Sequence, residues 1–245
     1  MGWGDELMAA GEAAALNGKV CIKGQSGEHR WHMAWENHPK IAKPNERYDN
    51  FITNGPGSRP YAKVATHEAW QWLPYRPKPA KFYFSAEEKA FADSLDGGFV
   101  VVEPNLKAKQ ESVNRDWGWD NFAKVTAAVD ADWVQFGERK PKLLPNTRWI
   151  ETPNPRYMAA ALSRAKTFLA PEGGIHHTSA AFRLPGVVLF GGFISPHVTG
   201  YTFHKNIFIG DDLGCGKRVK CQHCADAWGK IDPERIIKIM QGLLK

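Results

Sequence analysis

Long hydrophobic runs are missing from this 245-residue sequence, and no apolar stretch approaches the length that a membrane-spanning helix needs. The first residues also lack the basic start and apolar middle of a signal peptide. Cysteine is scarce, with four residues, which fits a reducing compartment better than a disulfide-stabilised scaffold. We therefore expect a soluble, cytoplasmic protein with no transmembrane segment.

Three of the four cysteines lie close together in the sequence, at Cys215, Cys221 and Cys224. With His223 and His204 nearby, they could supply the four ligands of a tetrahedral zinc site. The spacing lacks a clear second pair, however, and reduced cysteines in a glycine-rich loop explain the same pattern. Both interpretations stay open from the sequence.

Charges of both signs are present but unequal, with a formal net charge of +6 and a pI of about 9.1. Hydrophobic residues make up 43% of the chain, enough to bury a core, which excludes a disordered protein. The basic excess favours anionic partners such as nucleotide sugars, phosphorylated lipid surfaces or nucleic acid, without choosing among them.

Short apolar runs alternate with amphipathic segments, which indicates an α/β fold. Asp96-Gly97-Gly98 interrupts the chain just before the buried-type strand over Phe99 to Val102, so we place a domain boundary there, with domains over 1–97 and 98–245. The last helix, over 232–244, is a candidate to pack back on the N-terminal domain. Further strands are predicted over 19–23, 81–84, 133–136, 144–150, 168–170, 187–190 and 207–209, and further helices over 6–16, 85–95, 121–129, 155–165 and 175–182.

The N-terminal domain is the part that its sequence defines least. Residues 44–79 are rich in proline, glycine, asparagine and aromatic residues, so we expect mainly loops there. Residues 67–73 are a candidate helical turn within this stretch. The domain is therefore predicted to be small and loop-rich.

The most informative stretch follows the strand at Phe168 to Ala170. Glu172, Gly173 and Gly174 cannot continue that strand, and a helix is predicted directly after them. The start of a helix presents unpaired backbone N–H groups and the positive end of its dipole, which together favour an anion such as phosphate. Because glycine pairs before helices are common in α/β domains, an ordinary loop remains the alternative.

This stretch resembles the donor-site signature of glycosyltransferase family 9, the lipopolysaccharide heptosyltransferases. In that signature an acidic residue, two small residues and a nearby histidine precede a small-residue helix, a proline break and an apolar strand that ends in Phe-Gly. The resemblance implies a GT-B-like fold: two facing Rossmann-like domains, here with a shortened N-terminal one. The matching residues are Glu172, Gly173, Gly174, His177, Ala180, Ala181, Pro185, Leu189, Phe190, Gly191 and Pro196.

The N-terminal residues Gly2-Trp3-Gly4-Asp5 resemble the Gly-x-Gly-Asp turn with which the same family begins. The resemblance implies that Asp5 is the general base and that Gly4 lies on the acceptor side. The family has a parallel strand before this turn, whereas this chain has only Met1 there. Read from the residues alone, Asp5 is equally an acid in the first turn of a helix, a common position that requires no chemistry.

The donor-side residues come from several segments. Arg115-Asp116-Trp117 resembles the family's Lys-x-Trp-Pro motif, which implies that Arg115 contacts the donor phosphates, with Lys107 as a second candidate. Planar guanidinium donors suit phosphate oxygens, although without the resemblance a solvated run of charge is the favoured interpretation of these residues. Glu172 is expected to bind sugar hydroxyls, Gly173 and Gly174 to offer backbone N–H groups, His177 to position sugar or phosphate, and Glu138 to reach the ribose.

The reaction implied is transfer of a sugar from a nucleotide-diphosphate sugar to an acceptor hydroxyl, independent of metal and without a cofactor. The expected partners are that nucleotide sugar and an anionic acceptor, either a saccharide or lipid core. One alternative keeps the chemistry but takes a hydroxylated base in DNA as acceptor. A second alternative, of another class, is a non-catalytic module that binds nucleotides or nucleic acid.

Overall fold

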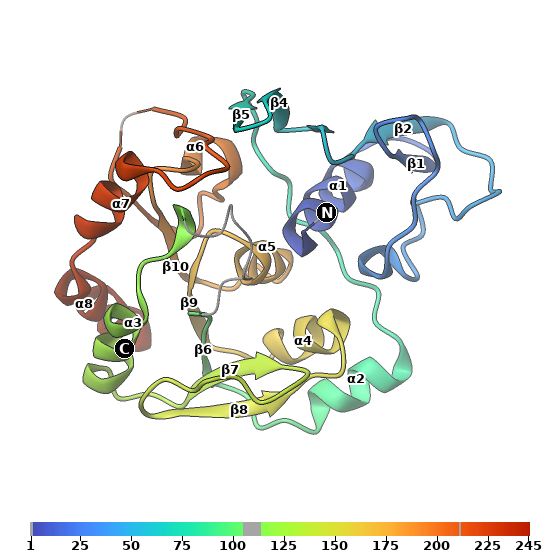
Figure 1. Cartoon of the computed structure of the whole chain (residues 1–245). Coiled ribbons are helices and arrows are strands. Elements are labelled where there is room, and N and C mark those ends of the chain that lie inside the picture. The colour runs from blue at the N-terminus through green and yellow to red at the C-terminus, as the bar shows by residue number, and fades with distance from the viewer. Residues whose placement is uncertain (1, 105–113, 211) are drawn as a thin grey trace.

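The computed structural model describes residues 2–104, 114–210 and 212–245 (Figure 1). A parallel sheet forms its centre, with helices on both faces and a smaller N-terminal part beside it. The elements in chain order are α1 (Trp3–Ala15), β1 (Val20–Lys23), η1 (Met33–Trp35), β2 (Asn50–Thr53), β3 (Ser58–Arg59), β4 (Ala62–Thr66), β5 (Ala69–Trp72), α2 (Ala86–Asp93), β6 (Val100–Val102), α3 (Trp119–Ala128), β7 (Trp133–Gly137), β8 (Thr147–Glu151), α4 (Pro155–Leu162), β9 (Thr167–Pro171), α5 (Gly174–Ala181), β10 (Gly186–Phe190), α6 (Pro196–Thr199), β11 (Lys205–Phe208), α7 (Gln222–Gly229) and α8 (Pro233–Leu244).

The central sheet has the order β11-β10-β9-β6-β7-β8, and all its neighbouring pairs are parallel. Numbered along the chain, the six strands follow the doubly wound order 3-2-1-4-5-6, in which the direction of winding reverses between β6 and β9. This sheet confirms the predicted α/β class. The reversal matters for function, because doubly wound sheets bind ligands beyond the carboxyl ends of the strands at such a point.

Alternating side chains of the strands fill two cores, one on each face of the sheet. Val101 and Phe168 pack on the face that α4 and α5 cover, whereas Val100 and Leu169 pack on the face that α3 and α8 cover. A strand points successive side chains to opposite faces, so a strand buried on both faces is apolar at every position. Figure 1 shows the two helical layers on either side of the sheet.

The N-terminal part contains a parallel pair of strands, β1 and β2, packed beside α1. Trp35 is fully buried there, and its indole N–H donates to the carbonyl of Glu6 at 2.9 Å. Helix α1 begins at Trp3, so the Gly2-Trp3-Gly4-Asp5 motif forms its first turn instead of a turn ahead of a helix at Glu6. A two-stranded sheet accounts for the shortness of this part.

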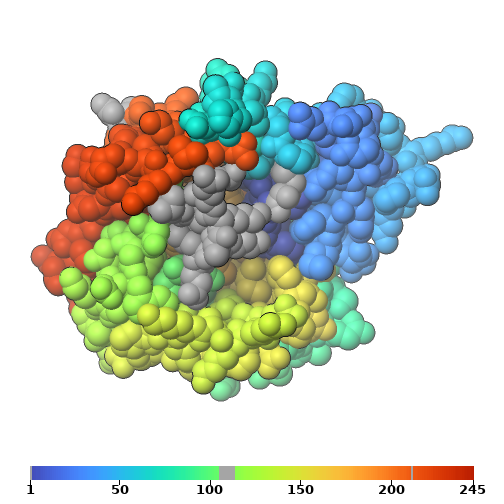
Figure 2. All heavy atoms as spheres, viewed as in Figure 1, coloured from blue at the N-terminus to red at the C-terminus, as the bar shows by residue number. Residues whose placement is uncertain are grey.

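A three-stranded antiparallel sheet, β3-β4-β5, joins the N-terminal part to the central sheet. Trp72 donates its indole N–H to the carbonyl of Phe193 at 3.0 Å, and Trp70 donates its backbone N–H to Gly216 at 2.9 Å. Figure 2 shows this segment in cyan, lying between the blue N-terminal and orange-red C-terminal parts. The helical turn predicted over 67–73 is therefore wrong: tryptophans at alternate positions place one face of β5 against the core.

Two further expectations need correction. Residues 81–84 join no sheet; Phe82 and Phe84 instead stack on Phe182, with ring centroids 5.7 and 6.1 Å away. Helix α8 packs on α3 and β10, within the C-terminal part, and not on the N-terminal domain. Its apolar stripe reaches the core under the sheet, because Ile236 and Met240 are buried there. Helix α7 was not predicted at all.

A buried ion pair fixes α2 against α4. Arg156 places Nε 2.5 Å and Nη2 2.7 Å from the two carboxylate oxygens of Glu88, and Nη2 also donates to the carbonyl of Tyr83 at 2.9 Å. Burial raises the pKa of Glu88, but the hydrogen bonds from Arg156 and the Ser85 N–H together lower it by more than burial raises it. The pKa of Glu88 is therefore below its usual value. This cluster connects both halves of the chain.

Replacing Arg156 with alanine is expected to lower the free energy of unfolding by about 3–5 kcal/mol, because Glu88 would keep its buried charge without a partner. Urea unfolding at neutral pH measures the loss. Arg148→Ala is the matched control: Arg148 makes a comparable paired contact with Asp132, but the two side chains are 46% and 52% exposed, so a change of about 1 kcal/mol or less is expected. Equal losses in the two variants would contradict this interpretation.

Candidate functional site

A cavity of ≈ 680 Å³ opens at the point where the winding of the central sheet reverses. Its walls come from the segments after β6, β7 and β9, from the first turn of α1, and from the β3-β5 sheet. Of the residues predicted for the site, the cavity brings together Gly4, Asp5, Arg115, Glu138, Glu172, Gly173, Gly174 and His177. Lys107, the remaining one, lies outside the described residues.

The first turns of α1 and α5 approach each other at van der Waals distance. A Cβ atom added to Gly4 would lie 2.6 Å from Cδ2 of His177, and one added to Gly174 would lie 3.5 Å from Trp3. The indole N–H of Trp3 also donates to the hydroxyl of Thr178 at 2.9 Å. Only glycine at position 4 allows this approach, which places the two predicted motifs at one cavity.

Asp5 accepts hydrogen bonds from three groups. Its Oδ2 accepts from the backbone N–H of Gly2 at 2.7 Å, and its Oδ1 accepts from Arg59 Nη1 at 3.1 Å and from the hydroxyl of Tyr61. Burial raises the pKa of Tyr61, and the charge of Asp5 raises it further, so Tyr61 remains a neutral donor at physiological pH. Asp5 thus closes the first turn of α1 with one oxygen while the other belongs to a network at the cavity.

Glu172 forms the opposite charged pair. Its Oε2 lies 3.1 Å from Arg115 Nη1, and its Oε1 lies 3.3 Å from Nε2 of His177. Burial alone would raise the pKa of this carboxyl, but the Arg115 charge and the contact with His177 outweigh it and bring the pKa to about 2. Glu172 is therefore a carboxylate at every physiological pH, able to accept hydrogen bonds but not to donate a proton.

His177 is held on both ring nitrogens. Its Nδ1 lies 3.0 Å from the Tyr201 hydroxyl, while Nε2 faces Glu172. Burial raises the pKa of Tyr201 well above its usual value, so this phenol stays protonated. With the ring fully buried and Gly4 packed on its edge, His177 can fix the position of Glu172.

Glu172, His176 and His177 also qualify by distance as metal ligands, because one ligand atom of each lies within 4.8 Å of the others. An ion there would have to share the Glu172 carboxylate with the Arg115 guanidinium, 3.1 Å away. Two cations that share one largely buried carboxylate lie close enough to repel each other strongly. The donor set therefore fits a metal poorly while Arg115 is in place.

Arg115 owes its position to the residues around it. Its guanidinium lies 4.6 Å from the centroid of the Phe193 ring, and Trp117 anchors the segment by donating its indole N–H to Ile231 at 2.9 Å. Gly118 has φ +92°, a conformation that proline cannot adopt, which explains why glycine stands where the resembling motif has proline.

The sequence analysis did not identify the residues that surround Asp5 or a second arginine of the cavity wall. Arg59 and Tyr61, which contact Asp5, and Arg218, which also lines the cavity, come from segments without a recognisable motif. The guanidinium of Arg59 lies 4.4 Å, and that of Arg218 5.4 Å, from the ring centroid of Trp70. Glu138 is exposed directly after β7 and lines the same cavity.

The sequence matches no protein-family model and no curated protein sequence. Solved structures do resemble it. A glycosyltransferase of family 9 from Veillonella parvula matches over 100% of this chain and 94% of its own, with a TM-score of 0.61 and 13% identity. The iron-containing dodecameric glycosyltransferase TibC from E. coli matches over 99% and 74%, with a TM-score of 0.60 and 13% identity. The chain has the family 9 fold.

This likeness confirms the predicted GT-B-like fold with a shortened N-terminal domain. E. coli ADP-heptose lipopolysaccharide heptosyltransferase II also matches, at 17% identity and a TM-score of 0.49, over 70% of this chain. The chain spans about half the length of that enzyme, 55% of it. At such identities the comparisons establish architecture, so the family 9 fold leaves the activity to be argued from the site.

Gly4→Ala is expected to lower the free energy of unfolding by about 1–3 kcal/mol, because the added methyl group overlaps His177, which its two partners hold in place. Gly242→Ala is the matched control in the exposed last turns of α8, where an added Cβ meets nothing within 4 Å and should stabilise the helix by about 0.5–1 kcal/mol. Thermal unfolding measures both, and a stabilised Gly4→Ala protein would contradict the close approach.

The Arg115–Glu172 pair should make stability depend on pH. Because its folded pKa, about 2, is below the usual 4.5, Glu172 stabilises the fold above pH 4.5 and loses this contribution as the pH falls towards 2. The stability advantage of the wild type over Arg115→Met, from urea unfolding, is therefore expected to be largest above pH 4.5 and to shrink below it. In a Glu172→Gln background the same difference should not vary with pH; persistence of the variation there would refute the assignment.

Proposed function

We propose that this chain is a glycosyltransferase that moves a sugar from a nucleotide-diphosphate sugar to an acceptor hydroxyl. The observation that carries the proposal is one cavity, at the reversal point of a doubly wound sheet, with a carboxylate from each half of the chain on its walls. Asp5 and Glu172 are both paired with arginines there. The two similar structures with TM-scores of 0.60 and 0.61 are glycosyltransferases, which supports the same chemistry.

The donor end is built for an anion with a neutral polar group attached. Arg115 offers planar N–H donors that pair well with phosphate oxygens, and the first turn of α5 adds backbone N–H groups at Gly173 and Gly174. Glu172 remains ionised beside them and can accept hydrogen bonds from sugar hydroxyls. Glu138, exposed after β7 on the cavity wall, is the candidate for the ribose hydroxyls.

At the acceptor end, Asp5 takes the proton of the acceptor hydroxyl while the oxygen of that hydroxyl forms a bond to the anomeric carbon of the sugar. The bond from that carbon to the diphosphate oxygen breaks, and the electron pair leaves with the nucleoside diphosphate. Arg59 and Tyr61 hold the Asp5 carboxylate in position through Oδ1, and Gly4 leaves room for the approach of the two halves. Arg115 and the helix start offset the growing charge on the leaving group, so this step uses no metal.

The acceptor proposed is an anionic saccharide or lipid core, as for a heptosyltransferase-like enzyme. Arg59 from the N-terminal part and Arg218 from the loop before α7 both lie over the Trp70 ring and give the cavity a basic rim, which suits such an acceptor. We place the enzyme in the cytoplasm, since its four cysteines are free thiols. No helix in the described part of the chain is long and apolar enough to cross a membrane.

Two substitutions test the roles separately. Asp5→Asn keeps the shape of the side chain but removes the base, so transfer is expected to fall by about 10²–10⁴-fold while the dissociation constant for the nucleotide changes little. Arg115→Ala is expected to weaken nucleotide binding by about 2–3 kcal/mol, the scale of a charge-assisted contact. Arg148→Ala, at the exposed edge of the sheet, is the control and should change neither.

The donor is found first, by measuring thermal shifts with nucleoside diphosphates and their sugars, because a ligand that binds only the folded state raises Tm. Titration calorimetry and a donor-hydrolysis assay then compare the variants. If the protein bound neither a nucleoside diphosphate nor a nucleotide-diphosphate sugar, the proposed function would be wrong. Full activity in Asp5→Asn would contradict the role of Asp5 as the base but not the proposed donor site.

A further inference from the structure

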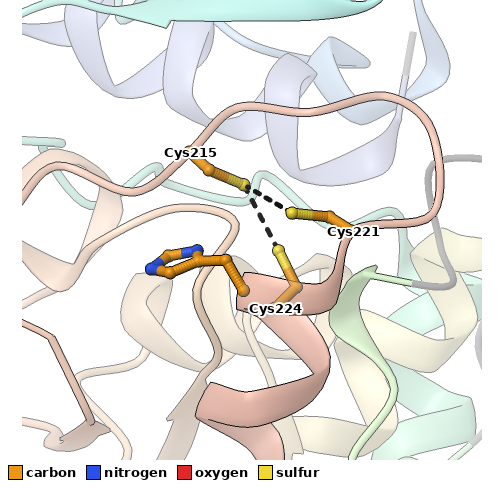
Figure 3. A group of neighbouring side chains, drawn as sticks. Cys215, Cys221 and Cys224 are labelled. Carbon is orange, nitrogen blue, oxygen red and sulfur yellow. Dashed lines mark hydrogen bonds between the residues drawn. The ribbon is translucent and has the colours of Figure 1, made fainter.

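Three thiols meet where the loop after β11 joins helix α7. Cys215 lies in the loop, Cys221 is the N-cap of α7, and Cys224 is in its first turn. The Cys215 sulfur lies 3.8 Å from that of Cys221 and 3.3 Å from that of Cys224 (Figure 3). A ligand atom of His223 completes a group of four within 4.8 Å of one another.

These distances fit a metal site better than a disulfide bond. A disulfide needs sulfur atoms about 2.05 Å apart, and all four cysteines of the chain are free. Around a tetrahedral ion with bonds of about 2.3 Å to sulfur, neighbouring ligand atoms lie about 3.8 Å apart. The observed separations of 3.3 and 3.8 Å need little adjustment to reach that arrangement.

The local structure also favours ligands over core thiols. Cys221 and Cys224 have two residues between them at the start of a helix, a common spacing for metal ligands, and backbone N–H groups there stabilise thiolates. Cys215 is half-buried and His223 is exposed, so neither is simply a filler of the apolar core. Figure 3 shows the three sulfur atoms pointing toward one another from two separate segments.

We propose that Cys215, Cys221, His223 and Cys224 bind one transition-metal ion, zinc or iron, in tetrahedral coordination. Three thiolates and one imidazole form a closed ligand set of the type found at structural zinc sites, with no open position for a substrate. The ion would link the loop to α7 and so stabilise the fold locally. This site is separate from the cavity and does not depend on the proposed function.

The position of the loop gives the ion a consequence at the cavity. Asn114, buried and directly before Arg115, donates to the carbonyls of Lys217 and Val219 at 2.7 and 2.8 Å and accepts from the N–H of Cys221 at 3.1 Å. The same loop carries Arg218 to the cavity wall. The bound ion therefore fixes the segment on which Arg115 and Arg218 depend.

Metal analysis of the purified, untagged full-length protein tests the site directly. About one equivalent per chain of zinc, or of iron, which takes the same thiolate-rich tetrahedral set, is expected. Cobalt added to chelator-treated protein should give thiolate charge-transfer bands and the visible absorption of tetrahedral coordination. Protein that contains no such metal and takes up neither zinc nor cobalt would overturn the proposal.

Variants separate ligation from folding. His223→Ala, at an exposed position, should fold and bind the ion more weakly, whereas Cys224→Ser should lose it. Cys21→Ala is the matched control, because Cys21 is a buried free thiol in β1, and it should keep the full metal content. An unchanged metal content in both His223→Ala and Cys224→Ser would place the ion elsewhere and overturn the assignment.

Hydrogen exchange tests the consequence at the cavity. Removing the ion with a chelator should speed amide exchange over residues 212–224 and over β5, which is bonded to this loop through Trp70 and Gly216. Exchange in β1 and β2 should stay unchanged and serves as the internal control. Exchange in the loop that is indifferent to the chelator would show that the ion does not fix this segment.

Discussion

The contact between the first turns of α1 and α5 is the constraint on which the site depends. Each turn begins a helix whose N–H groups need partners. Asp5 lies in the first turn of α1 and Glu172 lies just before α5, so the two carboxylates would repel without cations nearby. The Gly4 backbone against the His177 edge makes the approach sterically possible, and Arg59 and Arg115 make it electrostatically possible. The contact between the first turns of α1 and α5 is therefore both sterically and electrostatically favourable.

The two ion pairs have different surroundings, and their carboxylates differ in the groups that donate hydrogen bonds to them. Glu172 is buried beside an arginine and a histidine and has a low pKa, so it stays ionised and can accept hydrogen bonds. Asp5 receives a neutral phenol as well as a guanidinium, and phenol hydrogen bonds can rearrange without moving charge. The proposed base and the Glu172 carboxylate therefore differ in their hydrogen-bond partners although both line one cavity.

Local signals in the sequence predicted much of the fold but only part of the site. The Ser85 and Asp232 caps mark helix starts through bonds within three residues, and the glycine pair before α5 is equally local. Arg59 and Tyr61 reach Asp5 from 54 and 56 positions along the chain, and β5 shows only four residues of alternation. Such partners follow from chain topology, which no short pattern records.

The β3-β5 sheet has a consequence for how the two halves stay together. Its indole and backbone bonds to Phe193 and Gly216, with the buried pair of Glu88 and Arg156, hold the two halves together at sites other than the Asp96–Gly98 connection. The peptide link at that connection is therefore not what keeps the halves joined. A chain nicked there would remain one particle, and the cavity would keep its width without the wide hinge opening that separates lobes tied by a single linker.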